Sequence, residues 1–425
     1  MTLWVFGGSL IAAMAVGMPI AFALLVCGLA LMLYMGNFDA QIVAQNLVSG
    51  ADSFPLLAVP FFLLAGELMN AGGMSRRIVQ AAMAWIGHLR GGLGYVAVVA
   101  SVLMASLSGS AIADTAAIAA LMIPMMRQAG YDIPRSTGLI AAGGIIAPVI
   151  PPSIGLVLFG VAGGVSITKL FIAGVVPGIL LGVALAVTWW FVARRDKVAT
   201  TAAVPMPQRL QITARAGWAF VLPVVIVGGL KFGVFTPTEA AVVAVAYAFI
   251  VGKFIYGELA WKQVYGLMLS AAKTTSVVMF MVAAALVSAW LIAMADIPAQ
   301  VTQLMQPFMG NPKLLMFALM VLVVIVGTAL DFAPTILILT PVLMPMVKAA
   351  GIDPVYFGVM FVINNAIGLI TPPVGTVLNV ASGVARVPMA DVIRGVMPFM
   401  LAQLAVLFLL VLFPSIVTAP LALLR

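Results

Sequence analysis

A cluster of polar side chains interrupts a long apolar stretch in the first half of the chain. Residues 106–114 read SLSGSAIAD, between GYVAVVASVLMA and TAAIAALMIPMM. Ser106, Ser108 and Ser110 offer hydroxyl oxygens, and Asp114 adds a carboxylate. Oxygen ligands of this kind suit a hard cation, and an ionisable residue at membrane depth is a functional candidate by default. The segment is either a surface loop between two helices or a binding site held at membrane depth, and we favour the second interpretation.

Composition shows which class of protein surrounds this segment. The chain has 425 residues, of which 64% are hydrophobic and 8% charged, and its mean hydropathy is +1.24. Soluble domains carry about 25% charged residues. We therefore expect an all-α polytopic membrane protein surrounded by membrane lipid. One cysteine, Cys27, and one histidine, His88, rule out a Cys/His metal cage and disfavour His- or Cys-based catalysis, so we do not expect an enzyme or a cofactor.

The distribution of basic residues predicts the orientation in the membrane. The net charge of +8 needs no nucleic-acid partner, because basic residues beside membrane spans usually mark the cytoplasmic side. Their densest group lies in the linker 194–216, and it comprises Arg194, Arg195, Lys197, Arg209 and Arg215. We expect this linker to be cytoplasmic. No basic residue precedes Arg76, so we expect an external N-terminus.

The two sides of the linker repeat one another. PMMRQAGYD at 124–132 aligns without a gap with PMVKAAGID at 345–353, an offset of 221 residues. The same offset aligns Pro151–Pro152 with Pro372–Pro373, and 106–114 with GTALDFAPT at 327–335. Each twin contains one carboxylate, Asp114 or Asp331, four positions out of register. The sequence therefore predicts a duplicated unit, with a first repeat at 1–193 and a second at 217–425.

Each repeat is predicted to contain a hairpin and a broken helix. The apolar runs 91–129 and 314–350 hold polar residues near their middles, which is typical of a re-entrant hairpin. The runs 136–165 and 355–383 contain GGIIAPVIPPSIG and NNAIGLITPPVGT, whose prolines predict helices unwound within the membrane. Thr371 is placed to cap a half-helix that starts at Pro372. The alternatives are ordinary spans joined outside the membrane and simple proline kinks. The first apolar run, at about 3–35, is interpreted as the first membrane segment.

Broken helices at membrane depth indicate transport. Their N-termini can hold an anionic substrate, and their carbonyl ends, with nearby hydroxyls, can hold Na⁺. The hydroxyls are those of Ser106, Ser108, Ser110, Thr328 and Thr371. We interpret Asp114 and Asp331 as supporting carboxylates, which could tune a cation site, relay a proton or brace a hairpin. An aspartate dyad of an intramembrane enzyme is disfavoured, because the two carboxylates are out of register.

The combined motifs resemble a known family. SLSGSAIADTAA, GGIIAPVIPPSIG, FTPTEAA and NNAIGLITPPVGTVLNV are similar to segments of the large membrane subunit of tripartite ATP-independent periplasmic (TRAP) transporters, over essentially the whole chain. The resemblance implies an ion-transporter-superfamily fold with two inverted repeats and an elevator motion. It also implies sodium-coupled uptake of a dicarboxylate, sialic acid or other sugar acid across the bacterial inner membrane. The expected partners are a separate small four-helix membrane subunit and a periplasmic substrate-binding protein.

The resemblance also implies roles for individual residues. For the first sodium site these are Ser106, Ser108, Gly144 and Ala147, and for the second Gly327, Thr328, Gly368 and Thr371. The substrate region matches Ser108, Ser110, Ser153 and Thr376. The division of ligands between ions and substrate stays open. So does a stand-alone Na⁺- or H⁺-coupled carboxylate symporter of the same superfamily, which would need no binding protein.

Overall fold

The computed structural model describes residues 1–194, 202–328 and 330–424, and none of these forms a β-strand. Two linker residues used for the orientation prediction, Arg195 and Lys197, lie outside the described residues. Seven helices are long and apolar enough to cross a membrane, among them the 34-residue helix that starts at Trp261. The expected all-α polytopic membrane fold is confirmed.

The helices of the first half are α1 (Thr2–Ala15), α2 (Ile20–Met35), α3 (Ala40–Ala51), α4 (Ala58–Ala71), α5 (Met74–Ile86), α6 (Gly92–Ser108), α7 (Ala111–Gln128), α8 (Ile133–Gly144), α9 (Ile154–Gly163) and α10 (Ile167–Ala193). Those of the second half are α11 (Met206–Lys231), α12 (Pro237–Ile250), α13 (Trp261–Met294), α14 (Ile297–Leu304), α15 (Pro312–Gly327), α16 (Phe332–Ala349), α17 (Pro354–Gly368), α18 (Thr376–Ala385), α19 (Met389–Leu412) and α20 (Ser415–Thr418). A π-helical turn, Val251–Ile255, extends α12, and short 3₁₀ segments lie at Phe54–Leu57, Gln306–Phe308 and Ala419–Leu424.

The first apolar run differs from its prediction. It forms two helices, α1 and α2, which pack against each other instead of continuing as one segment. The break lies at Gly17, whose φ of 83° belongs to the left-handed region, and Pro19 precedes the first residue of α2. Glycine adopts this conformation without a steric penalty, and proline lacks the amide that a continuing helix would need. Hydropathy alone did not reveal this turn.

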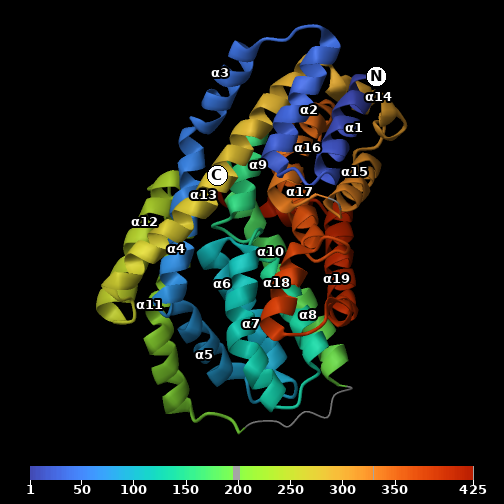
Figure 1. Cartoon of the computed structure of the whole chain (residues 1–425). Helices are drawn as coiled ribbons and strands as arrows, with labels where there is room; N and C mark the ends of the chain where they lie inside the picture. Colours follow the sequence, from blue (N-terminus) through green and yellow to red (C-terminus); the bar gives the residue numbers. More distant parts are fainter. Residues whose placement is uncertain (195–201, 329, 425) are drawn as a thin grey trace.

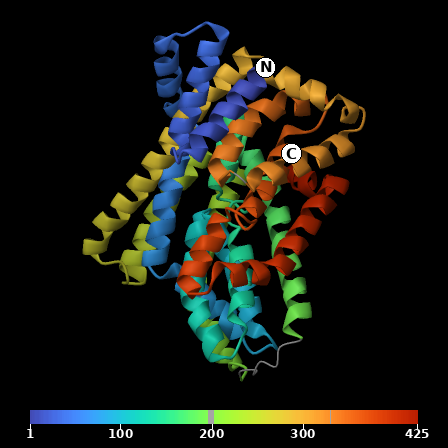
Figure 2. The same ribbon diagram turned by 45° about the vertical axis from the view of Figure 1, so that its right-hand side comes forward.

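The predicted duplication is visible in the helix bounds. Helix α7 starts at Ala111 and ends at Gln128, and α16 starts at Phe332 and ends at Ala349, so both ends are displaced by 221 residues. Helices α6 and α7 form the first hairpin, and α15 and α16 form the second. The first hairpin lies in the lower half of Figure 1 and the second in the upper half, and the turned view in Figure 2 agrees. The repeats are therefore inverted relative to each other.

Each broken helix is interrupted where its prolines predicted. Helix α8 ends at Gly144 and α9 begins at Ile154, while α17 ends at Gly368 and α18 begins at Thr376. The two halves pack crosswise. Helix α7 contacts α8 of its own repeat and α18 of the other, and α16 contacts α17 of its own repeat and α9 of the other. This exchange brings both hairpins and both broken helices to a common centre.

Candidate functional site

The first hairpin turns at Gly109 and Ser110. Gly109 has a φ of 64°, and a Cβ at this position would lie 2.4 Å from the carbonyl oxygen of Pro152. Both the left-handed conformation and the close approach require glycine here. The Ser110 hydroxyl accepts a hydrogen bond from the amide of Ala113 at 3.3 Å, so Ser110 caps α7. The tip of the first hairpin is thus held against the unwound part of the first broken helix.

Ser108 and Asp114 form the polar centre of this hairpin. The Ser108 hydroxyl donates to Asp114 Oδ1 at 2.5 Å, and both side chains are buried. The second carboxylate oxygen, Asp114 Oδ2, is buried without a hydrogen-bond partner among the described residues. Ser106 is half-buried, and its hydroxyl donates to the Leu103 carbonyl oxygen at 2.6 Å. A buried carboxylate oxygen without a donor is costly, so this position is suited to accept a cation or a proton.

The end of α8 lies directly behind these groups. A Cβ on Gly144 would lie 1.8 Å from Thr115 Oγ1, so only glycine fits against the neighbouring residue of Asp114. Thr115 is fully buried, and its hydroxyl has no hydrogen-bond partner among the described residues. Ala147 follows in the unwound segment and is also buried. The predicted first-site residues are therefore linked through Asp114 and Thr115, and Thr115 was missed although it directly follows the predicted carboxylate.

The second predicted site has a backbone contact at its centre. A Cβ on Gly368 would lie 2.9 Å from the Gly327 carbonyl oxygen, which places the second hairpin tip against the end of α17. Thr371 belongs to the same turn, since its amide donates to the Gly368 carbonyl oxygen at 3.0 Å. Thr328 ends α15, is half-buried and donates to the Ile325 carbonyl oxygen at 2.7 Å. The structure brings these four predicted residues together.

The predicted capping role of Thr371 is wrong. Helix α18 begins at Thr376 after Gly375, and the Thr371 hydroxyl donates backward to the Ile367 carbonyl oxygen at 2.8 Å. The capping hydroxyl occurs in the other repeat, where Ser153 accepts from the Leu156 amide at 3.1 Å. The unwound segment after Pro373 is long enough to delay the second half-helix by a turn. The local pattern could not distinguish these two starting points.

Asp331 and Thr376 connect the second hairpin to the second half-helix. The Thr376 hydroxyl donates to Asp331 Oδ1 at 3.4 Å, and both residues are half-buried. Asp331 occupies the N-cap position of α16, but its side chain makes no capping hydrogen bond. Its carboxylate also lines a cavity of about 460 Å³ between the hairpin and helices α2 and α13. Asp331 is therefore more open than Asp114, despite their related positions.

Comparison with known proteins assigns this arrangement to a family. Residues 8–416 match the family described as the tripartite ATP-independent periplasmic transporter, DctM component. The chain is 54% identical over 421 residues to the 2,3-diketo-L-gulonate TRAP transporter large permease protein YiaN of Escherichia coli, with 99% of both chains covered. The chain belongs to the TRAP transporter large permease family.

Other relatives have the same architecture but different printed substrates. The sialic acid TRAP transporter large permease protein SiaM of Vibrio cholerae is 37% identical, with 94% of this chain and 93% of the relative covered. Among solved structures, the Alcanivorax borkumensis YdaH transporter aligns with a TM-score of 0.64 at 15% identity, with 88% of this chain and 89% of that chain covered. The structural likeness shows a shared fold. Since the family is one of transporter permeases, the chain is a permease and not an enzyme.

Two buried amides complete the polar centre of this permease. Asn365 Nδ2 donates to the Phe332 carbonyl oxygen at 2.5 Å, and Gln403 of α19 donates to the Ala142 carbonyl oxygen at 2.8 Å. The side-chain oxygens of both lack partners among the described residues. Gln403 was not predicted, although it is an isolated amide in an otherwise apolar stretch of α19. These amides tie the hairpin and the broken helices to their surroundings.

The hydroxyl of Ser153, predicted to contact substrate, is occupied in this conformation. It donates to the Pro148 carbonyl oxygen, accepts from Leu156 and is fully buried. Its substrate role stays a prediction, and so do the roles of the other named ligands.

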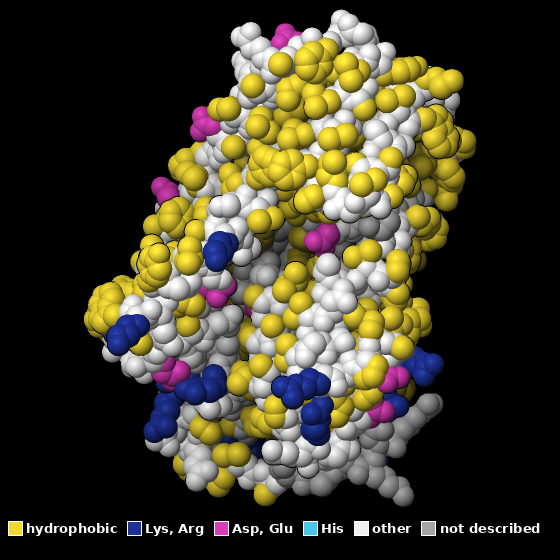
Figure 3. All heavy atoms as spheres, viewed as in Figure 1, with side chains coloured by type: hydrophobic (Ala, Val, Ile, Leu, Met, Phe, Trp, Pro, Cys, Tyr) yellow, Lys and Arg dark blue, Asp and Glu magenta, His cyan; other side chains and the backbone are white. Residues whose placement is uncertain are grey.

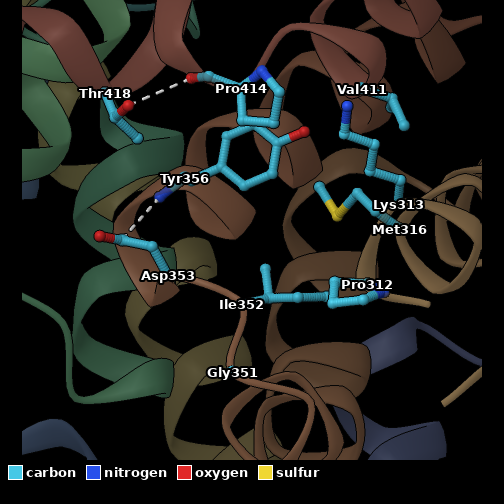
Figure 4. Close-up of a pocket in the computed structure, with 10 residues that line it drawn as sticks. All are labelled: Pro312, Lys313, Met316, Gly351, Ile352, Asp353, Tyr356, Val411, Pro414 and Thr418. Atoms are coloured by element: carbon cyan, nitrogen blue, oxygen red, sulfur yellow. Dashed lines mark hydrogen bonds between the residues drawn. The ribbon is translucent and has the colours of Figure 1, made fainter. Parts of the chain in front are cut away.

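A cavity at the rim of the permease is separate from this centre. It measures about 190 Å³ and lies between the start of α15, the turn before α17 and the end of α19 (Figure 4). Asp353 lies at its edge and accepts from the Tyr356 amide, which caps α17. None of the predicted ion or substrate residues lines it. We therefore place the functional site at the hairpin tips.

Proposed function

We propose that this chain is the membrane-translocating subunit for sodium-driven uptake of an organic acid across the bacterial inner membrane. The observation that carries the proposal is the pair of hairpin tips, each packed against the end of a broken helix. Ser108 with Asp114 and Gly327 with Gly368 mark the two centres. Hydroxyl, carboxylate and carbonyl oxygens are suitable ligands for a hard cation such as Na⁺. An elevator motion of the hairpins past the remaining helices would expose the centre alternately to the two sides.

The cargo is proposed to be a carboxylate of the sugar-acid class. The name of the relative with 54% identity over nearly its whole length supports this class, since that relative is a 2,3-diketo-L-gulonate transporter subunit. A C4-dicarboxylate relative from Pseudomonas aeruginosa shares 37% identity, so dicarboxylates are the neighbouring class. Half-helix N-termini and the hydroxyls of Ser110 and Thr376 would bind the acid group.

Delivery by a periplasmic binding protein and association with a small four-helix membrane subunit complete the proposal. The experiment reconstitutes this chain with the small subunit in proteoliposomes. Uptake of radiolabelled 2,3-diketo-L-gulonate, and of a dicarboxylate in parallel, is measured with and without the loaded binding protein and an inward sodium gradient. We expect uptake only when both are present. Equal uptake of free substrate without the binding protein would instead support a stand-alone symporter.

A further inference from the structure

One face of α13 runs past both hairpin tips and carries a lysine that the predicted site does not use. Near its start, the Ser270 hydroxyl donates to Glu67 of α4 at 3.2 Å. Glu67 follows Gly66, where an added Cβ would lie 3.2 Å from Ser108 Cβ at the first hairpin tip. Further along, Ser276, Val277 and other α13 residues line the 460 Å³ cavity that Asp331 of the second hairpin enters. Helix α13 thus passes from one tip to the other.

Lys273 lies on this face, between the two contacts. Residues three and four apart share one side of an α-helix, so Lys273 projects on the same side as Ser270 and Val277. One turn is about 5.4 Å, which is within the reach of a lysine side chain, so its ammonium group can extend into the cavity beside Asp331. Figure 3 shows a hollow at mid-height of this face of the molecule, with charged side chains of both signs at its borders.

The position of Lys273 within the membrane span needs an explanation. It is the thirteenth residue of α13, about 18 Å along the helix axis from Trp261. Lys262 and Lys273 are the charged residues of this helix, and only Lys262 lies in the terminal turn. Lys273 is exposed and makes no ion pair among the described residues. A charged residue inside a span is expensive and usually faces a wet cavity with a functional role.

We propose that Lys273 binds the carboxylate of the transported acid, an inference that rests on the proposed function. The ion and substrate segments themselves contain no lysine or arginine. They do contain two carboxylates, Asp114 and Asp331, which repel an anion. Thr376, one of the predicted substrate contacts, hydrogen-bonds to Asp331 at the edge of the same cavity. A positive charge opposite this point, supplied by α13, offsets the repulsion and attracts the anionic cargo between the two hairpin tips.

The test exchanges the charge at this position by chemical modification. Lys273→Cys is reconstituted with the small subunit and the loaded binding protein, and uptake of radiolabelled 2,3-diketo-L-gulonate is measured at a subsaturating concentration. We expect about a tenfold loss, as for a hydrogen bond to a charged group. Modification with 2-aminoethyl methanethiosulfonate restores a positive charge and should restore uptake. Modification with 2-sulfonatoethyl methanethiosulfonate adds a negative charge and should not. The half-saturating sodium concentration should stay unchanged.

Matched controls isolate the effect of charge. Lys262→Cys, in the first turn of the same helix, should transport normally before and after both reagents. The wild-type chain reports other effects of the reagents, because its single cysteine, Cys27, is fully buried. Lys273→Arg should keep most of the uptake. Normal uptake by Lys273→Cys, or equal effects of the two reagents, would overturn the proposal and indicate a lysine that extends to the lipid headgroups.

A second comparison separates cargo binding from an ion pair with Asp331. If the only partner of Lys273 were Asp331, then Lys273→Met and Asp331→Asn would lower uptake equally, and the double variant would be no worse than either. That result would also overturn the proposal. Uptake without sodium or without the binding protein would contradict the proposed coupling, yet the two reagents would still report on Lys273. The failure of one proposal is thereby distinguishable from the failure of the other.

Discussion

Gly327 and Gly368 meet through their backbones at the second hairpin tip. A Cβ on Gly368 would lie 2.9 Å from the Gly327 carbonyl oxygen and 3.4 Å from its Cα. The neighbouring atoms belong to the backbone, so they cannot rotate away as a side chain could. The equivalent approach in the first repeat is between Gly144 and the Thr115 hydroxyl. Close contact between hairpin and broken helix is therefore a shared requirement of the two repeats, although different atoms make it.

The first prediction concerns this contact. Gly368→Ala should push the second hairpin away from α17, because overpacking of a tight site typically costs about 1–3 kcal/mol. We expect sodium-dependent uptake to fall at least about tenfold at normal expression. Gly383→Ala, in α18 of the same repeat, is the matched control, since a Cβ there meets nothing within 4 Å. Equal uptake by the two variants would show that the contact is not required.

The second prediction concerns the hydroxyls of the two proposed cation sites. Ser108→Ala removes the donor to Asp114, and Thr371→Val removes a hydroxyl while roughly keeping its shape. A lost ligand or hydrogen bond of this kind costs about 1–3 kcal/mol, so the half-saturating sodium concentration should rise roughly five- to a hundredfold. Sodium titration of uptake measures this. Ser9→Ala, on α1, serves as control, because its hydroxyl bonds only to carbonyl groups of its own helix. Unaltered sodium dependence in both variants would make the tips structural turns.

The third prediction separates the two carboxylates. Asp114→Asn keeps an acceptor for the Ser108 hydroxyl but removes the negative charge, whereas Asp331→Asn changes a half-buried group with a long hydrogen bond. Charge interactions are stronger where water is excluded. We expect sodium affinity to fall at least about tenfold in Asp114→Asn and clearly less in Asp331→Asn. The opposite order, measured by sodium titration of both variants, would contradict the assignment of Asp114 to the first site.

The fourth prediction concerns orientation. Ala203 is exposed just before α11, and Asn37 is exposed in the connection between α2 and α3 at the opposite end of the molecule (Figure 1). With a cytoplasmic linker, a membrane-impermeant maleimide should label Asn37→Cys in intact cells, but Ala203→Cys only after permeabilisation. Buried Cys27 should contribute little background labelling. Labelling of Ala203→Cys from outside would reverse the proposed orientation.

The sequence alone determined the duplication and the interruptions. The offset of 221 residues relates α7 to α16 at both ends, and each proline pair lies in a helix break. These features are local, because a helix needs a backbone amide every residue and proline removes one. The hairpin tips were also predictable, since polar residues in an apolar run mark the point where the chain turns. The roles of the tip residues in binding sodium and substrate stay predictions.

Only the tertiary structure decided which side chains face one another. It paired Asp331 with Thr376, set Gly155 of α9 against Phe332 of α16, and aligned Lys273 with the two hairpin tips. It also moved the start of α18 from Pro372 to Thr376. Nearly all helices of this chain are apolar around most of their circumference, so hydropathy does not specify which faces meet. In a membrane protein that choice depends on close packing and on hydrogen bonds between distant segments, which are features of the assembled fold.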